Sequence, residues 1–215
     1  MTRIVCISDT HEKHAQVTLP EGDILVHAGD STFRGEFYAV ASFANWLKQQ
    51  PHQHKIVIAG NHELSFQTPY RKMMLNLLLE AGVIYLEDSG MEINNLFFYG
   101  TPWQPWFHDW AFNLPRDGEE LRNKWKQIPD QTNILISHGP PYGILDGVQD
   151  ISRGPQGCKL LKKRVVRLPK LKAHIFGHLH HDGGQTVNLG GVQFVNAAIC
   201  DDMYNPSRTP IVIEI

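Results

Sequence analysis

The stretch IVCISDTH, residues 4–11, is a short apolar run that stops abruptly at Asp9 and His11. The same arrangement, an apolar run followed at once by polar side chains, recurs in DILVHAGD (23–30), KIVIAGNHE (55–63), NILISHGPP (133–141) and AHIFGHLH (173–180). Runs of this length without polar alternation are typical of strands that are buried on both faces. We therefore predict buried strands over residues 3–8, 23–27, 55–59, 133–137 and 173–176.

Stretches with helical periodicity lie between these runs, at residues 36–48, 69–80, 119–126 and 158–167. Strands that alternate with helices pair in parallel through crossover connections, which indicates an α/β architecture. Later apolar segments at 83–86, 93–99, 186–196 and 211–215 have less helix between them, and we expect them to form a second, mixed sheet. The chain of 215 residues has no internal repeat, so we predict a single domain over residues 1–215.

The composition is that of an ordinary globular protein, with 42% hydrophobic and 20% charged residues. The formal net charge of -2 supplies no field that would draw the chain onto a membrane or an extended nucleic acid. Its three cysteines show no C-x-x-C pairing, and the sequence contains neither a signal peptide nor an apolar stretch of about 20 residues. We expect a cytoplasmic protein, and the sequence carries no signal for an oligomeric state.

Polar side chains that can bind metal or phosphate follow each of the five predicted strands. These clusters are Asp9-Thr10-His11, Gly29-Asp30, Gly60-Asn61-His62-Glu63, Ser137-His138-Gly139-Pro140-Pro141 and Gly177-His178-Leu179-His180. In open parallel sheets, ligands bind beyond the carboxyl ends of the strands, where distant parts of the sequence converge. By chance, this composition gives about 0.7 occurrences of D-x-H but only about 0.05 each of G-N-H and G-H-x-H. All five clusters at strand ends therefore predict one functional site.

The residue types in these clusters indicate a pair of divalent cations. Imidazole nitrogens with carboxylate or amide oxygens, and no thiolate, suit Mn²⁺, Fe²⁺ or Zn²⁺. Asp9 and His11, and likewise His178 and His180, are two residues apart, and such side chains project to the same side of an extended segment. Two cations about 3.5 to 4 Å apart repel each other, so a carboxylate must bridge them, and Asp30 is our candidate. Metallopeptidase, Walker A and serine-hydrolase motifs are absent.

In the order of these motifs the sequence resembles the calcineurin-like metallophosphoesterase superfamily, whose pattern is D-x-H, G-D, G-N-H-[DE], a histidine in an S/T-H-x-P-P context, and G-H-x-H. The match runs from Asp9 to His180. Within it, SHGPPYGILDG (137–147) and RGPQGCKLL (153–161) look like the small metallophosphoesterase-domain-containing subfamily. The resemblance implies a four-layer α/β/β/α sandwich of two mixed, largely parallel sheets flanked by helices.

The resemblance also implies a ligand set and a reaction. One metal would be held by Asp9, His11, Asp30 and His180, and the other by Asp30, Asn61, His138 and His178. His62 would bind no metal but would contact the phosphate and protonate the leaving oxygen, so we assign His62, Asp30 and Asn61 to catalysis. The expected function is hydrolysis of a small phosphoester or nucleotide substrate by a metal-bridging hydroxide, with Mn²⁺ as the favoured metal. The narrower resemblance favours a phosphodiester over a monoester.

Two other functions stay open at this point. A metal-containing protein that binds a nucleotide or a phosphoprotein with little turnover would carry the same ligand set, because tight product binding can silence a complete site. A nuclease is a weaker alternative, because the sequence shows no basic stripe that would follow a long phosphate backbone.

The remaining candidates are interpreted as structural. Segment 101–115, rich in Trp and Pro, is predicted to be a loop anchored by buried aromatic rings rather than a substrate contact. His27 and His174 are expected to be packed and hydrogen bonded inside strands. Solvated or loop positions are expected for His14, His52, His54, His108 and His181. Arg34, Arg153 and Asp146 lie near the motifs and receive no role.

Overall fold

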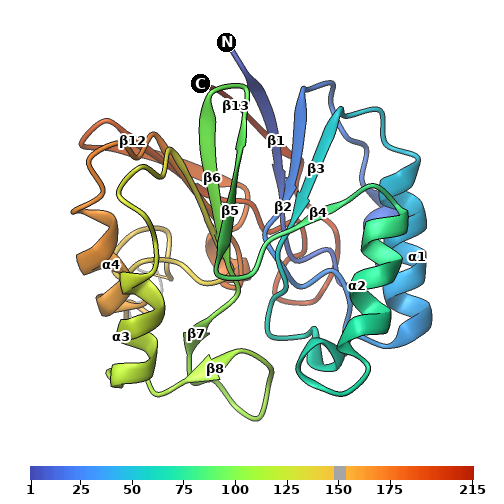
Figure 1. Ribbon diagram of the computed structural model, residues 1–215, viewed down its shortest axis with the longest axis horizontal. Helices are drawn as coiled ribbons and strands as arrows, with labels where there is room; N and C mark the ends of the chain where they lie inside the picture. The colour runs from blue at the N-terminus through green and yellow to red at the C-terminus, as the bar shows by residue number, and fades with distance from the viewer. Residues whose placement is uncertain (148–153) are drawn as a thin grey trace.

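Two β-sheets face each other in the computed structural model, which describes residues 1–147 and 154–215 (Figure 1). The first sheet has the order β13-β1-β2-β3-β4. Its strands are β1 (Arg3–Ile7), β2 (Ile24–His27), β3 (His54–Val57), β4 (Ile84–Tyr85) and β13 (Ile211–Glu214). Neighbouring strands are parallel except β13, which runs antiparallel to β1.

The second sheet has the order β11-β12-β10-β9-β6-β5. Its strands are β5 (Ser89–Ile93), β6 (Leu96–Thr101), β9 (Ile134–Ser137), β10 (Ala173–Phe176), β11 (Gln185–Leu189) and β12 (Val192–Asn196). The four central strands are parallel, and the edge strands β5 and β11 are antiparallel to their neighbours. A short parallel pair, β7 (Gln104–Pro105) and β8 (Asn113–Leu114), lies below the sheets in Figure 1.

Helices cover the outer face of each sheet, as the sequence predicted. Helices α1 (Phe37–Lys48) and α2 (Arg71–Glu80) lie on the first sheet, while α3 (Glu119–Lys126) and α4 (Lys159–Val165) lie on the second (Figure 1). The connections within the described residues include the short 3-10 helices η1 (His14–Gln16), η2 (Leu64–Gln67) and η3 (His180–Asp182). The result is the predicted four-layer α/β/β/α arrangement.

The alternation of side chains along each strand builds the layers. In β1, Ile4 and Cys6 point into the core between the two sheets, whereas Val5 and Ile7 point toward α1 and α2. Both faces of the strand are therefore buried, and all four residues are 0% exposed. Burial on both faces explains why these strands read as continuous apolar runs in the sequence.

The prediction that the four later segments form the second, mixed sheet is met for 93–99 and 186–196, which contain β6, β11 and β12, and was wrong for 83–86 and 211–215. Strand β4 extends the first sheet beside β3, and β13 pairs with β1, while β9 and β10 belong to the second sheet. Segment 186–196 is a hairpin of β11 and β12 that turns at Gly190 and Gly191, both with positive φ. An apolar run indicates that a strand is buried. Because both sheets bury their strands, the run does not indicate which sheet the strand joins.

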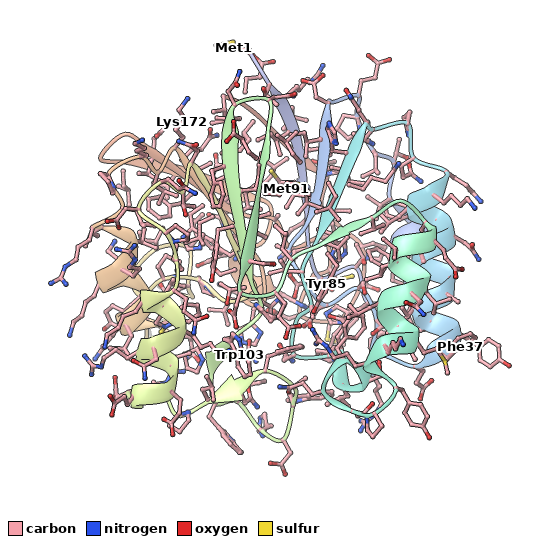
Figure 2. The ribbon with its side chains drawn as sticks, in the orientation of Figure 1. Met1, Phe37, Tyr85, Met91, Trp103 and Lys172 are labelled. Carbon is pink, nitrogen blue, oxygen red and sulfur yellow. The ribbon has the colours of Figure 1, made fainter. Side chains whose placement is uncertain are left out.

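The carboxyl ends of the parallel strands meet at one end of the sandwich, opposite the two chain termini (Figure 1). Side chains fill the space between the layers, and Trp103 lies at this same end, near β7 (Figure 2). Among the described residues, no helix is long and apolar enough to cross a membrane.

Candidate metal centre

The side chains predicted to bind metal converge at the carboxyl ends of strands from both sheets. The first sheet contributes the residues after β1, β2 and β3, and the second contributes those after β9 and β10. Donor atoms lie within 4.8 Å of one another in each of three groups: Asp9, His11 and His180; His11, Asp30 and His62; and Asp30, His138 and His178. The spatial prediction made from the strand-end motifs is met for all of these residues.

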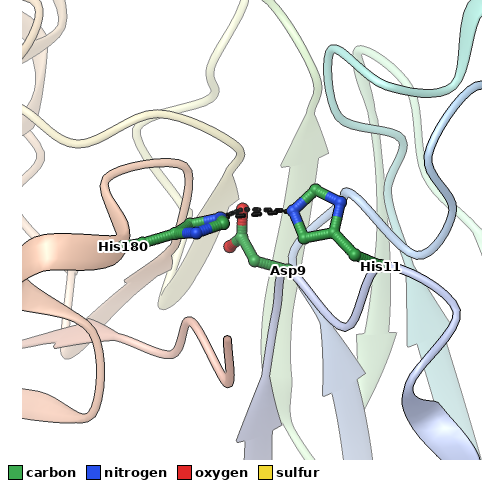
Figure 3. Close-up of side chains that lie close together, drawn as sticks. All are labelled: Asp9, His11 and His180. Atoms are coloured by element: carbon green, nitrogen blue, oxygen red, sulfur yellow. Dashed lines mark hydrogen bonds and ion pairs between the residues drawn. The ribbon is translucent and has the colours of Figure 1, made fainter. Parts of the chain in front are cut away.

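Asp9 lies between two imidazoles in the first group (Figure 3). Its Oδ1 is 3.3 Å from His180 Nε2 and 4.0 Å from His11 Nε2. The two Nε2 atoms are 3.2 Å apart. His11 comes from the first sheet and His180 from the second, so this group spans the junction of the sheets.

Asp30 is shared between the groups. Its Oδ2 is 3.2 Å from His138 Nε2 and 4.0 Å from His11 Nε2. Asn61 adds its amide on the His138 side, where its Oδ1 is 2.9 Å from His138 Nε2. A carboxylate at the centre of two donor groups has the position that a bridging ligand requires.

Backbone carbonyls fix the orientation of four of the imidazoles. In each of them Nδ1–H donates to a carbonyl: His11 to Thr32 (3.3 Å), His62 to Phe33 (2.7 Å), His138 to Ala28 (2.9 Å) and His180 to Asp201 (2.9 Å). Because Nδ1–H is held by the carbonyl, Nε2 faces the centre, and binding of a cation there would release the proton that Nε2 carries when the imidazole is charged. Such bonds are how proteins orient histidines that bind metal.

The backbone turns sharply at four of the predicted ligands. Asp9, His11, Asp30 and His178 have φ angles of 51°, 39°, 56° and 67°. The prediction that Asp9 and His11 share a site because they lie on an extended segment was therefore wrong in its reason, although the two residues do meet. Left-handed conformations cost about 1 to 3 kcal/mol each and concentrate at functional sites.

Glycine is required where the backbone passes close to the carboxylates. A Cβ on Gly177 would overlap Asp9 Oδ2 and Ser8 Oγ, and one on Gly60 would overlap Asp30 Oδ1. A glycine at the end of a strand suits either an ordinary turn or a close approach of the backbone to a ligand or its neighbours. The structure supports the second interpretation at these two positions, because a side chain there would displace a predicted ligand.

Glu63 connects two loops of the centre, a role that its motif alone did not predict. Its buried carboxylate accepts hydrogen bonds from the backbone N–H of Asp30 (2.9 Å), Thr32 (3.1 Å) and Gly60 (2.7 Å), and from the hydroxyls of Ser31 and Thr32. It therefore fastens the loop after β2 to the loop after β3. Its position in the G-N-H-E motif was the feature of the sequence that could have indicated this role.

The two central carboxylates remain ionised. Burial alone would raise the pKa of Asp30, but the charges of His138 and His62 outweigh it, and the pKa lies well below its usual range. Burial alone would also raise the pKa of Asp9. The hydrogen bond from His180 outweighs burial, so the pKa of Asp9 is lowered as well. Burial alone would lower the pKa of His138, yet Asp30 raises it to about 9. The site thus attracts positive charge.

This donor set fits divalent cations. Asp9 and Asp30 are 0% and 2% exposed, and among residues 1–147 and 154–215 their ion-pair partners are histidines, never Lys or Arg. Buried carboxylates need compensating charge, and the inward-facing imidazole nitrogens and the Asn61 amide oxygen add ligands of the kind that Mn²⁺, Fe²⁺ and Zn²⁺ accept.

Segment 101–115 is only partly the anchored loop that the sequence predicted. Trp103 is held by packing against Phe112 and by its Nε1–H, which donates to Asp88 Oδ2 at 2.8 Å. Trp110, in contrast, stacks on His62, with ring centroids 4.2 Å apart. The interpretation of the whole segment as structural was therefore incomplete, because one of its rings packs on a predicted catalytic residue.

Tyr204 is a second residue that the motifs do not reveal. Its ring meets His11 and His180 edge-on, at centroid distances of 4.8 and 5.5 Å. The turn that carries it is closed by Asp201 Oδ1, which accepts from the N–H groups of Met203 and Asn205. Tyr204 follows the last motif, and no spacing in the sequence links it to the histidines.

A cavity of about 450 Å³ opens beside the centre. The centre contributes Asp30, Asn61, His62, His178 and His180 to its wall. Segment 101–115 contributes Gln104, Pro105 and Phe107, and Tyr204 lies on the wall as well. The volume lies in the range of small-molecule sites.

The histidines outside the centre follow the predictions in part. His27 and His174 are buried in strands, and their Nε2 atoms are hydrogen bonded to Thr10 Oγ1 (2.9 Å) and Ser137 Oγ (2.8 Å), as predicted. The prediction for His14 was wrong, because His14 is only 3% exposed and begins η1, whereas His52 lies in a loop as predicted, although it is 2% exposed. His14 packs against Phe43 and Trp46, and His52 Nε2 donates to Pro20 O. His108 and His181 are exposed, and His54 begins β3.

The three candidates without a role are now partly placed. Arg34 lies over the Trp110 ring at 5.6 Å. Asp146 is buried and accepts from the N–H groups of Gly143 and Gly157, so its contacts are structural. Arg153 lies outside the described residues.

Comparison with known proteins places this centre in a family. The family of calcineurin-like phosphoesterases matches residues 2–182. The chain is 40% identical to human metallophosphoesterase domain-containing protein 1, over 100% of this chain and 71% of that protein. It is 39% identical to the Caenorhabditis elegans UPF0046 protein K07C11.7, over 99% of this chain and 75% of that protein. The structure of TT1561 from Thermus thermophilus superposes with a TM-score of 0.63 at 13% identity, covering 91% and 88% of the two chains, and so shares the fold.

Proposed function

The chain belongs to the calcineurin-like phosphoesterase family, and from this premise we propose that it hydrolyses a phosphodiester of a small, nucleotide-like molecule with two divalent cations, Mn²⁺ being favoured. The observation that carries the proposal is the position of Asp30 between two donor groups. Cations bound there would supply an activated water at neutral pH and positive charge beside the phosphoryl oxygens.

The proposed ligands are the residues that the sequence indicated. Asp9, His11, Asp30 and His180 would hold one cation, and Asp30, Asn61, His138 and His178 the other. Their fixed imidazole orientations mean that little reorganisation is needed when cations bind.

His62 is proposed to act as the general acid. Its Nε2 is 3.8 Å from Asp30 Oδ2 and lies on the cavity wall, while Nδ1 is held by the carbonyl of Phe33. Trp110 stacks on its ring, so the imidazole is fixed from two directions. A proton delivered at Nε2 to the departing oxygen contributes about 10²- to 10⁴-fold to the rate.

The cavity favours a diester over a monoester. A phosphoryl group at the centre leaves most of the 450 Å³ volume for its substituents, and the wall beyond the centre includes Pro105, Phe107 and Leu179. A diester places two organic groups on phosphorus, and an apolar wall binds such groups through burial of their surface.

The test is turnover of bis(p-nitrophenyl) phosphate by the Mn²⁺-loaded protein. We expect hydrolysis that a chelator abolishes and that Asp30→Asn lacks. The exposed Asp130→Asn serves as the control, since Asp130 lies outside both the donor groups and the cavity wall. Stoichiometric nucleotide binding without turnover would instead identify a binding protein.

The role of His62 is tested separately with His62→Gln. This variant should retain metal and lose more rate on an alkyl phosphodiester than on a p-nitrophenyl one, because a poor leaving group depends more on protonation. Equal rate losses on the two esters would contradict the general-acid role.

A further inference from the structure

The cavity has a second part that the hydrolytic chemistry does not use. Arg116, Gln156, Gly157 and Cys158 line it without belonging to any of the donor groups, and together they form what we call the far wall. A binding site that only held the phosphoryl oxygens at the centre would not need the residues of this wall. The far wall is therefore available to the part of the substrate that is attached to phosphorus.

Arg116 is the single Lys or Arg on the cavity wall in the described part of the chain. Its Nη1 donates to the carbonyls of Gln156 (3.0 Å) and Gly157 (3.2 Å). In residues 1–147 and 154–215 it forms no ion pair with a carboxylate. The carbonyl bonds hold the guanidinium in place and leave its Nη2 and Nε donors without a partner among these residues.

Besides Arg116 and the donor groups, Asp202 is the charged side chain on the cavity wall among the described residues. Its Oδ2 lies 3.7 Å from His181 Nδ1. Pro140, Leu179 and glycines supply uncharged surface. Arg116 is consequently an oriented cation whose Nη2 and Nε donors are not used by residues 1–147 or 154–215, and a guanidinium with such donors binds phosphate in a forked geometry.

Gln104 adds a neutral acceptor to the cavity wall. Its Nε2 donates to Asn113 Oδ1 at 3.1 Å, and the Asn113 amide is itself fixed because its Nδ2 donates to the carbonyls of Phe107 and His108. This network determines which way the Gln104 amide faces. Its Oε1 is buried and has no partner within the described ranges.

We infer that the substrate carries a second phosphate on the group attached to the scissile phosphorus, and that Arg116 binds this phosphate. The inference rests on the proposed function and makes it more specific: the substrate class is a phosphodiester with a further, terminal phosphate. Arg116 is then a specificity-determining residue, since it contacts substrate away from the bond that breaks.

The test measures binding, so that it does not depend on turnover. Affinities of thymidine 3′,5′-bisphosphate and thymidine 5′-monophosphate are determined by calorimetry with the Mn²⁺-loaded parent, Arg116→Gln and the control Arg122→Gln. Arg122 is an exposed residue of α3 that is absent from the cavity wall. We expect the parent and Arg122→Gln to prefer the bisphosphate by about 10-fold or more, the effect of one charge-assisted hydrogen bond, and Arg116→Gln to lose the preference.

Two results would overturn the inference. One is equal affinity of the parent for the two ligands. The other is an equal loss for both ligands in Arg116→Gln, which would show that the residue only fastens the backbone at 156–157. Hydrolysis of thymidine 5′-(p-nitrophenyl phosphate) is measured in parallel, because turnover without any bisphosphate preference leaves the proposed function standing while this inference fails.

Discussion

Replacing Glu63 with glutamine tests how the centre is held together. The carboxylate Oε2 accepts from the N–H groups of Asp30 and Gly60, and Oε1 accepts from the N–H of Thr32 and from two hydroxyls. Whichever way the new amide turns, its NH₂ group faces at least one of these three backbone N–H donors. A buried donor left without a partner costs about 1 to 3 kcal/mol.

A second effect works in the opposite direction. Burial and the charge of Asp30 raise the pKa of Glu63, so a neutral side chain relieves part of the cost of burying this carboxylate. The surviving bonds, however, lose the strength that an ionised acceptor gives them. We therefore expect Glu63→Gln to lower the free energy of unfolding of the metal-free protein by about 2 kcal/mol at pH 7.

Urea denaturation measures this loss, and titration with Mn²⁺ measures its effect on the centre. Metal affinity should fall about 10- to 100-fold, as it does when groups that orient ligands are removed. The control is Glu12→Gln, because the Glu12 carboxylate accepts one exposed bond, from Phe33 N–H at 3.1 Å, and its loss should stay within about 0.5 kcal/mol. If Glu63→Gln matches the control in both stability and metal affinity, Glu63 does not hold the two loops.

Three further predictions concern the room for a side chain beside Asp9, the pH dependence of stability, and the effect of metal on the melting temperature. Gly177→Ala should displace Asp9 and weaken Mn²⁺ binding at least about 10-fold by titration, while Gly139→Ala, whose Cβ meets other atoms only at 3.8 Å or more, should bind like the parent. Burial lowers the pKa of His174 from 6.5 to about 3, so at pH 5.5 the unfolded chain binds a proton there that the folded chain does not. Stability is thus lost as the pH falls below 6.5, and between pH 7.5 and 5.5 the parent should lose about 1.4 kcal/mol more in urea denaturation than His174→Gln does. Removing metal should lower the melting temperature, since a ligand at about 100 times its dissociation constant adds about 2.7 kcal/mol; equal melting curves with and without chelator would show that no cation binds the folded state.

The features that the sequence predicted well are those that a short segment determines. An apolar run buried on both faces, followed by polar residues, locates both a strand and its carboxyl end, and parallel pairing then places Asp9, Asp30 and Asn61 together. Helix α3 was predicted at its observed bounds because Leu121 and Trp125, four residues apart, form one buried face.

The features that it missed depend on contacts between distant segments. Trp110 reaches His62 across 48 positions, and nothing in either segment specifies that stacking. Tyr204 reaches the histidines because the chain before it runs beside the end of β1, where Ile199 N–H donates to Ser8 O and Cys200 N–H donates to Asp9 O. His14 looked like a solvated residue, yet its packing against α1 is decided by the helix and not by its own neighbours.

The measurement that tests the central claim most directly is the metal content of the purified, Mn²⁺-loaded protein and of Asp30→Asn. If Asp30 is shared by two donor groups, the parent should hold two cations per chain, and the variant should hold fewer than one after the same dialysis. Two cations retained by Asp30→Asn, or a parent that never holds more than one, would contradict the account.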